Sequence, residues 1–314
     1  MAKLVIALGG NALQEGNNIS AEDQLQACKH TASSIVELIK QKHKIAIVHG
    51  NGPQVGNMIA IIEAANKADN KHPIFPFDVC NAFTQGYIGY HLQNSIGDEL
   101  AKNGIKKGVA TIVTQLEVNK EDPAFQNPTK PIGSFYSKEA AEALIAAEGY
   151  QMKEDAGRGW RRVVASPKPL DIIEKNIIKD LFTQGIITIS CGGGGIPVIR
   201  EGLNLIGAAA VIDKDFAAAK LAEILDADML IILTAVEKVA INFNKPNQED
   251  LRILDVKEAI RHISNNQFAP GSMLPKIQAA ISFVQRNPHG KALITSLEKA
   301  ADGIKGLTGT IIHA

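Results

Sequence analysis

Several features that often reveal a protein's class are scarce or missing in this 314-residue chain. It contains only three cysteines, Cys28, Cys80 and Cys191, and an odd number at such wide spacing provides neither a disulfide framework nor a metal-ligand pattern. Lysine plus arginine equals aspartate plus glutamate at 33 each, so no basic excess indicates a nucleic-acid or anionic-membrane partner. We therefore expect a protein of a reducing compartment. Any anion that it binds must be recognised by a local group of residues, because the chain has no overall positive charge.

Long apolar segments are also missing. No window approaches the roughly 20 apolar residues of a membrane span. The apolar run at the N-terminus is interrupted by Gly9 and Gly10, too early for the core of a signal peptide. We expect a soluble, cytoplasmic protein without a membrane partner, and its 45% hydrophobic content is ample for a buried core.

Short apolar runs alternate with amphipathic windows along most of the chain. This pattern is typical of βα units laid into a mostly parallel sheet that helices cover on both faces, and it predicts an α/β fold, a three-layer α/β/α sandwich. Strands are predicted at 4–8, 45–48, 109–113, 186–190, 229–234, 292–295 and 310–313. Helices are predicted after a capping box at 20–23 and over 54–66, 81–102, 138–148, 170–184, 215–226, 256–264 and 273–286.

One long segment, 118–164, departs from this rhythm. It carries Pro123, Pro128 and Pro131, the aromatic pair Phe135 and Tyr136, and a charged run at 153–162. A loop of this length inside a compact domain is usually either disordered or functional. Its aromatic residues and short helical window predict an ordered lid or small subdomain that protrudes from the sandwich.

Three apolar runs end in glycine-rich turns, at 9–11, 50–52 and 192–195. A turn without Cβ atoms exposes backbone N–H groups at the edge of a sheet, where a phosphate or small anion can approach them closely. An isolated glycine pair is more often only a tight turn. Taken together, the three turns indicate phosphate chemistry.

The P-loop motif G-x-x-x-x-G-K-[ST] is absent, which excludes the commonest nucleotide-kinase architecture. Cations for a phosphate must come from elsewhere, and three lysines have unusual neighbours. Lys130 precedes Pro131, Lys214 lies between two aspartates, and Lys276 follows Pro275. Any one of them alone is more often a solvated surface group. The proline-constrained turn at Lys130 and the helix N-terminus at Lys276 nevertheless favour anion binding.

Seven ordered sequence blocks lie at 7–12, 49–57, 127–133, 154–161, 190–197, 211–215 and 270–276. Together they resemble the carbamate kinase family, which is part of the amino acid kinase superfamily. The resemblance spans essentially the whole chain, and seven blocks are far more specific than one glycine motif.

The resemblance implies the amino acid kinase fold, with 1–314 forming one domain. An N-terminal carbamate lobe would cover about 1–185 and carry the protruding subdomain at about 118–164. A C-terminal nucleotide lobe would cover about 186–314.

The activity that the resemblance implies is reversible phosphoryl transfer between ATP and carbamate, giving ADP and carbamoyl phosphate, with Mg²⁺ as cofactor. It also implies a homodimer, and ATP synthesis in fermentative arginine breakdown. Phosphoryl transfer has a loose, highly charged transition state, so alignment and electrostatic stabilisation dominate the catalysis. Carbamate already carries an anionic oxygen nucleophile, so no general base is needed and the lack of an evident catalytic histidine is expected.

Site residues follow from family position. Lys130 and Lys276 would neutralise the transferred phosphoryl and the terminal ATP phosphates, Lys214 would serve the nucleotide phosphates, and Asp215 would hold the lysines in place. The catalytic candidates are Lys130, Lys214, Asp215 and Lys276. The substrate-binding candidates are Gly9, Gly10, Asn11, Gly50, Asn51, Gly52 and Arg158, the last of which would help to close the lid. The nucleotide-binding candidates are Gly192, Gly193, Gly194, Lys214, Ala235, Val236, Met273 and Lys276, and no protein ligand to a metal is predicted.

The chain departs from the family pattern near the expected adenine site. Ala235 and Glu237 stand where some relatives have glycine and aspartate. The first strand also lacks a lysine that some members of the superfamily carry there, and Lys130 becomes its expected substitute. Beside the glycine turns, His49 is interpreted as a polar strand end, and Cys191 as a small buried residue rather than a nucleophile.

Two rival functions stay open at the level of sequence. A dinucleotide-dependent oxidoreductase would fit Gly50, Gly52 and Gly56, which follow a strand and open a helix. Pro53 inside the turn and the lack of an acidic residue about 20 positions later argue against it. The other rival is a catalytically silent carbamate kinase homologue that senses a ligand or assembles with a partner, and the retained lysines argue for activity instead.

Overall fold

The computed structural model describes residues 1–10, 13, 20–155 and 157–314. The substrate-binding candidate Asn11 lies outside the described residues.

A central sheet of eight strands, counted over the described residues, runs through the molecule in the order β15-β17-β16-β12-β1-β2-β9-β3. All neighbouring pairs are parallel except β16 and β17. The strands are β1 (Lys3–Leu8), β2 (Lys44–His49), β3 (Val109–Thr111), β9 (Ile187–Ile189), β12 (Met229–Thr234), β15 (Ile253–Asp255), β16 (Lys291–Ser296) and β17 (Thr310–His313). The seven predicted strands are therefore all present, and all belong to this sheet.

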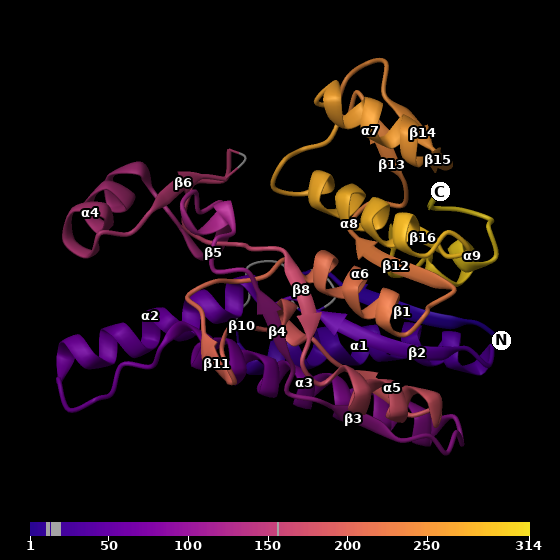
Figure 1. Ribbon diagram of the computed structural model, residues 1–314, viewed down its shortest axis with the longest axis horizontal. Helices are drawn as coiled ribbons and strands as arrows, with labels where there is room; N and C mark the ends of the chain where they lie inside the picture. The colour runs from indigo at the N-terminus through magenta and orange to yellow at the C-terminus, as the bar shows by residue number, and fades with distance from the viewer. Residues whose placement is uncertain (11–12, 14–19, 156) are drawn as a thin grey trace.

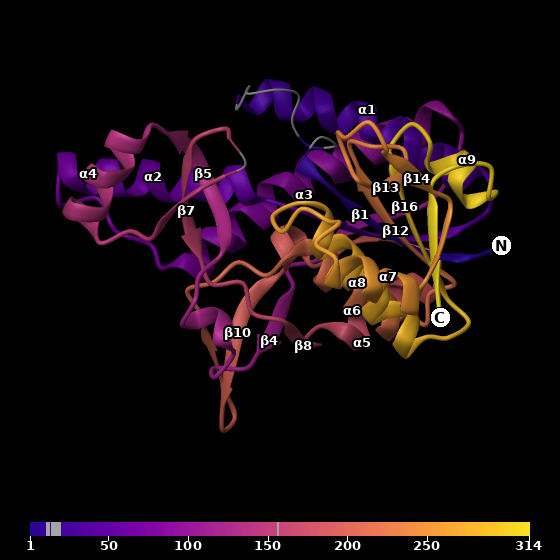
Figure 2. The same ribbon diagram turned by 90° about the horizontal axis from the view of Figure 1, so that it is seen from above.

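Helices cover both faces of the sheet, as Figure 2 shows with α1 on one side and α6 and α8 on the other. The helices are α1 (Ala21–Lys40), α2 (Gly52–Ala68), α3 (Phe77–Lys102), α4 (Lys138–Glu148), α5 (Lys175–Thr183), α6 (Lys214–Ile224), α7 (Val256–Ser264), α8 (Met273–Arg286) and α9 (Ala300–Ile304). The helix predicted over 170–184 needs correction, because its first part forms the strand β8 (Pro169–Ile172) and the helix begins only at Lys175.

The strands of the central sheet are continuous apolar runs because both of their faces are buried, as β1 shows. Leu4, Ile6 and Leu8 pack into one cluster with side chains of α1 and α3, whereas Val5 and Ala7 pack into a second cluster with α6 and α8. All five side chains are fully buried. Burial of an aliphatic side chain stabilises the fold by about 2 kcal/mol, so both faces of the sheet contribute to one stable sandwich.

A second sheet, not predicted from the sequence, lies beside the sandwich in the order β11-β10-β4-β8. Its further strands are β4 (Gln115–Val118), β10 (Ile196–Glu201) and β11 (Asn204–Gly207). A short hairpin is formed by β13 (Val239–Ile241) and β14 (Glu249–Leu251).

The predicted subdomain stands away from the sandwich together with the far end of α2 (Figure 1). It consists of α4 and a three-stranded antiparallel sheet in the order β5-β7-β6, followed over the described residues. Its strands are β5 (Lys130–Tyr136), β6 (Met152–Glu154) and β7 (Trp160–Val164). The long departure from the βα rhythm is thus an ordered subdomain.

Candidate active site

The turns after β1 and β2 meet at one edge of the central sheet. The two strands are parallel and in register, with Leu8 opposite His49, so the chain leaves both at the same level. The N–H of Gly50 donates to the carbonyl of Leu8 at 3.3 Å. A Cβ at Gly9 would lie 2.9 Å from the carbonyl oxygen of Leu233, which leaves room only for glycine beside the end of β12.

Three lysines from distant parts of the chain converge on two aspartates at the N-terminus of α6. Lys130, the first residue of β5, places its Nζ 2.5 Å from Oδ2 of Asp213. The two oxygens of Asp215 divide between the other lysines, with Oδ1 lying 2.5 Å from Lys214 Nζ and Oδ2 lying 2.9 Å from Lys276 Nζ. Asp213 also caps α6, because its Oδ1 accepts the backbone N–H of Asp215 at 2.9 Å.

The carboxyl groups of this cluster are ionised. Burial alone would raise the pKa of Asp213 and of Asp215, but the adjacent lysines outweigh burial and hold both pKa values below the usual range. Burial lowers the pKa of Lys214. Burial acts in the same direction on Lys276, but the pairing with Asp215 prevails and raises its pKa. Among the described side chains, three ammonium groups thus meet two carboxylates, and the excess positive charge suits a phosphate.

Two adjoining cavities open at this cluster. The smaller, of about 190 Å³, is lined by Lys130, Lys214 and residues 50–54 of the turn after β2. The larger, of about 510 Å³, is lined by Lys276, by Ala235 and by the chain around 296–298. Gly10, Arg158 and Gly271 line both cavities. The lysine cluster therefore lies at the junction of a small compartment and a large one.

The structure distributes the other predicted site residues unevenly. Gly9 lines the larger cavity, whereas Gly50, Asn51 and Gly52 line the smaller one. Val236 and Met273 are not among the described residues that line either cavity.

The glycine turn after β9 packs against the turn after β2. A Cβ at Gly192 would overlap the ring of His49, and one at Gly193 would overlap the amide of Asn51. The backbone of Gly193 has a φ of +68°, a left-handed conformation that favours glycine. Gly193 lines the smaller cavity, and none of residues 192–194 is among the described residues lining the larger one. These predicted nucleotide-binding glycines therefore lie with the substrate-binding candidates.

A buried polar network behind these turns was missed from the sequence. The Asn51 amide Nδ2 donates to Oδ1 of Asn81 at 3.1 Å and to the hydroxyl of Thr84 at 2.8 Å. Asn81 in turn donates to the carbonyl of Ala210 at 3.0 Å, and Gln85 donates to the carbonyl of Gly192 at 2.8 Å. Positions 81, 84 and 85 lie on one face of α3, so a polar stripe at helical spacing was the available signal.

His49 is the last residue of β2, Cys191 lies two residues after the end of β9, and both are fully buried. His49 is fully buried, and burial lowers its pKa to about 4, so the imidazole is neutral near pH 7. Burial also raises the pKa of the Cys191 thiol, which keeps it protonated. The three cysteines are all buried and free.

The tip of the subdomain adds a second arginine to the smaller cavity. Asp155 pairs with Arg158 at 3.0 Å and with Arg161 at 3.2 Å, and both guanidinium groups lie over the ring of Phe135. Arg161 also donates twice to the carbonyl of Gly133, at 2.9 and 3.2 Å. Arg161 was not a site candidate from the sequence, although it belongs to the same charged run as Arg158.

Neither a metal-ligand cluster nor a membrane helix is found in the described part of the chain. No group of three or more histidine, cysteine, aspartate or glutamate side chains there is arranged to hold a metal. None of the helices described is both long enough and apolar enough to cross a bilayer.

Comparison with known families decides what kind of protein carries this site. Residues 2–296 match the model of the amino acid kinase family. The chain belongs to that family. It is a kinase, because carbamate kinases are similar to it along nearly its whole length. The carbamate kinase of Clostridium perfringens is 58% identical over 311 residues, 99% of either chain, and that of Staphylococcus haemolyticus is 51% identical over 99% of either chain.

Other relatives refine this assignment. The carbamate kinase-like protein YqeA of Escherichia coli is 57% identical, over 99% of this chain and 98% of its own. The structure of Giardia lamblia carbamate kinase bound to AMP-PNP superposes with a TM-score of 0.89 at 40% identity, covering 99% of this chain and 98% of its own. UMP kinase from Bacillus anthracis, at 13% identity and a TM-score of 0.53, shares the fold alone. The predicted fold class and family resemblance are confirmed.

Proposed function

We propose that this kinase transfers a phosphoryl group reversibly between ATP and carbamate, with ADP and carbamoyl phosphate as the other pair. The observation that carries the proposal is the cluster of Lys130, Lys214 and Lys276 at the junction of the two cavities. A transferred phosphoryl group passes between two substrates, so its charge must be stabilised where their compartments meet.

The two cavities suit substrates of unequal size. The smaller cavity, of about 190 Å³, would take carbamate, and the larger, of about 510 Å³, would take the nucleotide. The anionic oxygen of carbamate attacks the terminal phosphorus of ATP, the bond from that phosphorus to the bridging oxygen breaks, and ADP leaves with the electron pair. No proton has to be removed from the nucleophile, so a neutral buried His49 is compatible with this chemistry.

The charged residues would share the work of alignment. Lys130 would bind the transferred phosphoryl group from the carbamate side, and Lys276 would bind the same group and the terminal phosphates from the nucleotide side. Lys214 would serve the nucleotide phosphates, and Asp215 would orient it together with Lys276. Arg158, which lines both cavities, would help to close the lid over the reactants.

Backbone donors would complete the site. We propose that the turn at Gly9 and Gly10 and the turn from Gly50 to Gly52 present N–H groups to carbamate and the phosphoryl group. We place Gly192 to Gly194 on the carbamate side of the site, because they pack against His49 and Asn51. Ala235 lines the larger cavity and would contact the nucleotide, and Val236 and Met273 would do so only with some rearrangement. The carbamate lobe would end near residue 185.

The metal requirement of a kinase would be met through the nucleotide. The site carboxylates Asp213 and Asp215 are engaged by lysines, and the described residues form no metal-ligand cluster, so the site does not fit a resident metal ion. We propose that Mg²⁺ enters bound to the phosphates of ATP or ADP.

A coupled assay tests the proposed function. Purified protein with Mg²⁺, ADP and carbamoyl phosphate is expected to form ATP, which hexokinase and glucose-6-phosphate dehydrogenase would report as NADPH. Nucleotide binding without ATP formation would favour the silent homologue. Tight NADH binding without ATP binding would favour the oxidoreductase.

We further propose a cytoplasmic homodimer that makes ATP during arginine breakdown. Carbamoyl phosphate is a reactive mixed anhydride, so its chemistry favours phosphorylation of ADP. For the dimer, the support is a face of α3 on which Phe83 and Tyr90 are 40% and 59% exposed, next to the edge strand β3. Exposed aromatic side chains on one helix face are typical of contact surfaces.

A further inference from the structure

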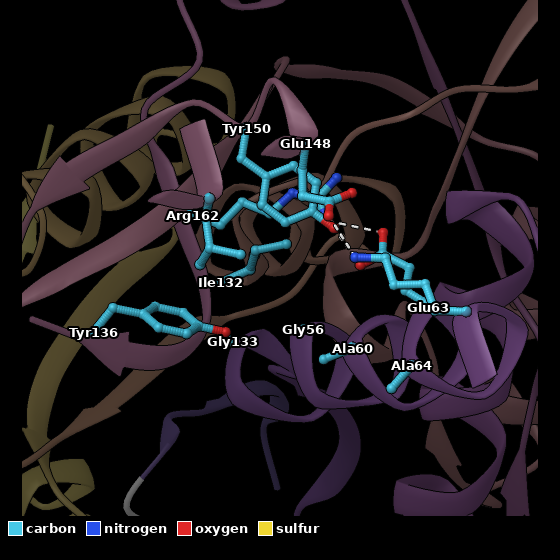
Figure 3. Close-up of a pocket in the computed structure, with 12 residues that line it drawn as sticks. Gly56, Ala60, Glu63, Ala64, Ile132, Gly133, Tyr136, Glu148, Tyr150 and Arg162 are labelled. Carbon is cyan, nitrogen blue, oxygen red and sulfur yellow. Dashed lines mark hydrogen bonds and ion pairs between the residues drawn. The ribbon is translucent and has the colours of Figure 1, made fainter. Parts of the chain in front are cut away.

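A third cavity lies between α2 and the protruding subdomain, apart from the active site (Figure 3). Its volume is about 190 Å³, and among the described residues it shares no lining residue with the two active-site cavities. One wall is α2, with Gly56 and Glu63, and the other is the subdomain, with Tyr150 and Arg162. The cavity therefore marks the boundary between two bodies, the sandwich with its helix α2 and the protruding subdomain.

The charged groups in this cavity pair across the boundary. Glu63 of α2 accepts a hydrogen bond from the Tyr150 hydroxyl and lies 3.4 Å from Nη1 of Arg162. The Arg162 guanidinium also lies 3.8 Å from the centre of the Tyr150 ring. Lys67 of α2 pairs with Glu148 at the end of α4. Since each of these charges already has an opposite partner on the facing body, the cluster is built to join the bodies rather than to bind a charged ligand.

Below the charged groups, α2 and β5 touch backbone to backbone. A Cβ at Gly56 would fall well inside contact distance of the backbone N and Cα of Gly133. Gly133 has a φ of +70°, and its carbonyl is held by Arg161. The contact between Gly56 and Gly133 thus sets a short, fixed separation between the helix and the strand, with little freedom for either.

Both partners of this contact lead directly into the active site. Helix α2 begins at Gly52, and Asn51 and Gln54 at its start line the smaller cavity. Strand β5 begins at Lys130, three residues before Gly133, a span of about 10 Å in an extended strand. A shift of β5 away from α2 would therefore move Lys130 relative to Asp213 and to the substrate turn.

We propose that Gly56, Glu63 and Tyr150 are positioning residues for the transfer reaction. They form a joint, defined as the contact between Gly56 and Gly133 together with the cluster of Glu63, Tyr150 and Arg162. The joint holds the subdomain at the angle that places Lys130 over the smaller cavity. This inference rests on the proposed function, because the quantity that the joint controls is alignment for phosphoryl transfer.

Gly56→Ala is the sharpest test, with Gly97→Ala in α3 as its matched control. Alanine is the better helix former at both sites, but a Cβ at Gly97 meets nothing within 4 Å. We expect Gly56→Ala to lower kcat/KM for carbamoyl phosphate by about 100-fold, the size expected for a misplacement near 1 Å. The Kd for ADP, whose cavity does not touch the joint, should change less than about threefold. Gly97→Ala should match wild type in its kinetics.

The charged part of the joint provides a second test that does not depend on tight packing. Glu63→Ala should lower kcat/KM for carbamoyl phosphate by about tenfold, and Glu63→Gln, which still accepts from Tyr150, should restore part of that loss. Tyr150→Phe and Glu63→Ala should be non-additive in a double-mutant cycle, because both act through one contact. Glu37→Gln, which removes a comparable surface charge paired with Lys40 on α1, is the control and should have no effect.

The results separate this inference from the proposed function. If wild type forms ATP and both Gly56→Ala and Glu63→Ala retain its kcat/KM for carbamoyl phosphate, the joint does not position Lys130 and the inference is wrong. If the variants lose ADP affinity as strongly as they lose kcat/KM for carbamoyl phosphate, and their melting temperature falls as well, the joint has only a structural role. That result would also overturn the inference. If wild type itself forms no ATP, the proposed function fails, and the inference that rests on it fails with it.

Discussion

Lys130 carries the most direct prediction at the scale of single residues. Lys130→Ala should reduce the rate of ATP formation from carbamoyl phosphate at least about 100-fold, as loss of one charge-stabilising group does at other transfer sites. The fold should persist, because Asp213 still caps α6 and has Lys214 nearby. Steady-state kinetics and circular dichroism would test this. Lys120→Ala, at an exposed position, is the control, and equal rates for both variants would contradict the role of Lys130.

Asp215 orients two lysines at once, so its neutralisation should affect both stability and catalysis. In Asp215→Asn, one oxygen at most can still accept, and the amide nitrogen faces an ammonium group. Loss of one partner from a buried ion cluster costs about 3–5 kcal/mol in free energy of unfolding. Urea denaturation should measure this loss. Steady-state kinetics should show a lower turnover for Asp215→Asn than for Asp180→Asn, the control at an exposed position. Unchanged stability would mean that Asp215 does not hold the cluster together.

His49 predicts a pH dependence of stability. Its pKa is about 4 in the folded chain and about 6.5 when unfolded, so as pH falls through this window only the unfolded chain takes up the proton. The free energy of unfolding should therefore drop by about 3 kcal/mol between pH 6.5 and pH 4 on account of this group. His49→Gln should lack that part of the slope, whereas His289→Gln, at an exposed site, should keep it. Parallel urea titrations across this pH window would test the assignment, and equal slopes for wild type and His49→Gln would refute it.

At the scale of elements, α3 connects the substrate turn to the segment before α6. Asn81→Ala would leave the Ala210 carbonyl and one Asn51 amide hydrogen without their partner. Buried groups that lose a hydrogen bond cost about 1–3 kcal/mol each, so the free energy of unfolding should fall by about 2–4 kcal/mol. Asn176→Ala, at an exposed position on α5, should change it by less than about 0.5 kcal/mol. Similar values for the two variants would show that the network does not brace the turn.

The sequence predicted some elements better than others for a physical reason. The strands of the central sheet are buried on both faces, so each is a continuous apolar run, such as Met229–Thr234. Strands of the second sheet are short and partly exposed, and Ile206 in β11 is 47% exposed. Such segments resemble loops, because their pairing comes from distant partners and leaves little pattern in the chain.

At the scale of the whole molecule, the exposed face of α3 predicts self-association. Tyr90→Glu should weaken the proposed homodimer at least about tenfold, because it puts a charge at the centre of an aromatic contact. Sedimentation velocity over a dilution series would measure this. Ile177→Glu on α5, where the side chain is equally exposed at 59%, is the control and should leave the association unchanged. A wild-type monomer at all concentrations would refute the dimer.

The arrangement of the bodies explains how distant segments form one site. Lys130 comes from the subdomain, Lys214 from α6 and Lys276 from α8, and they meet because the parallel strands end at one edge and α2 holds the subdomain there. Arg161 and the joint at Gly56 belong to this arrangement as well. Their importance depends on which surfaces face each other, a property that is not visible along the chain.

The sequence by itself determined the layered fold, the ordered subdomain, the three lysines and the family, because apolar periodicity and local motifs record burial and backbone geometry residue by residue. Only the tertiary structure decided how the three lysines share two carboxylates. It also decided that the turn at Gly192 to Gly194 packs against His49 and Asn51, and that α3 and α2 contact the segments that form the site. Apart from the pair of Lys214 and Asp215, those facts depend on contacts between residues 30 to 143 positions apart, which form only when the sheet and the subdomain pack together.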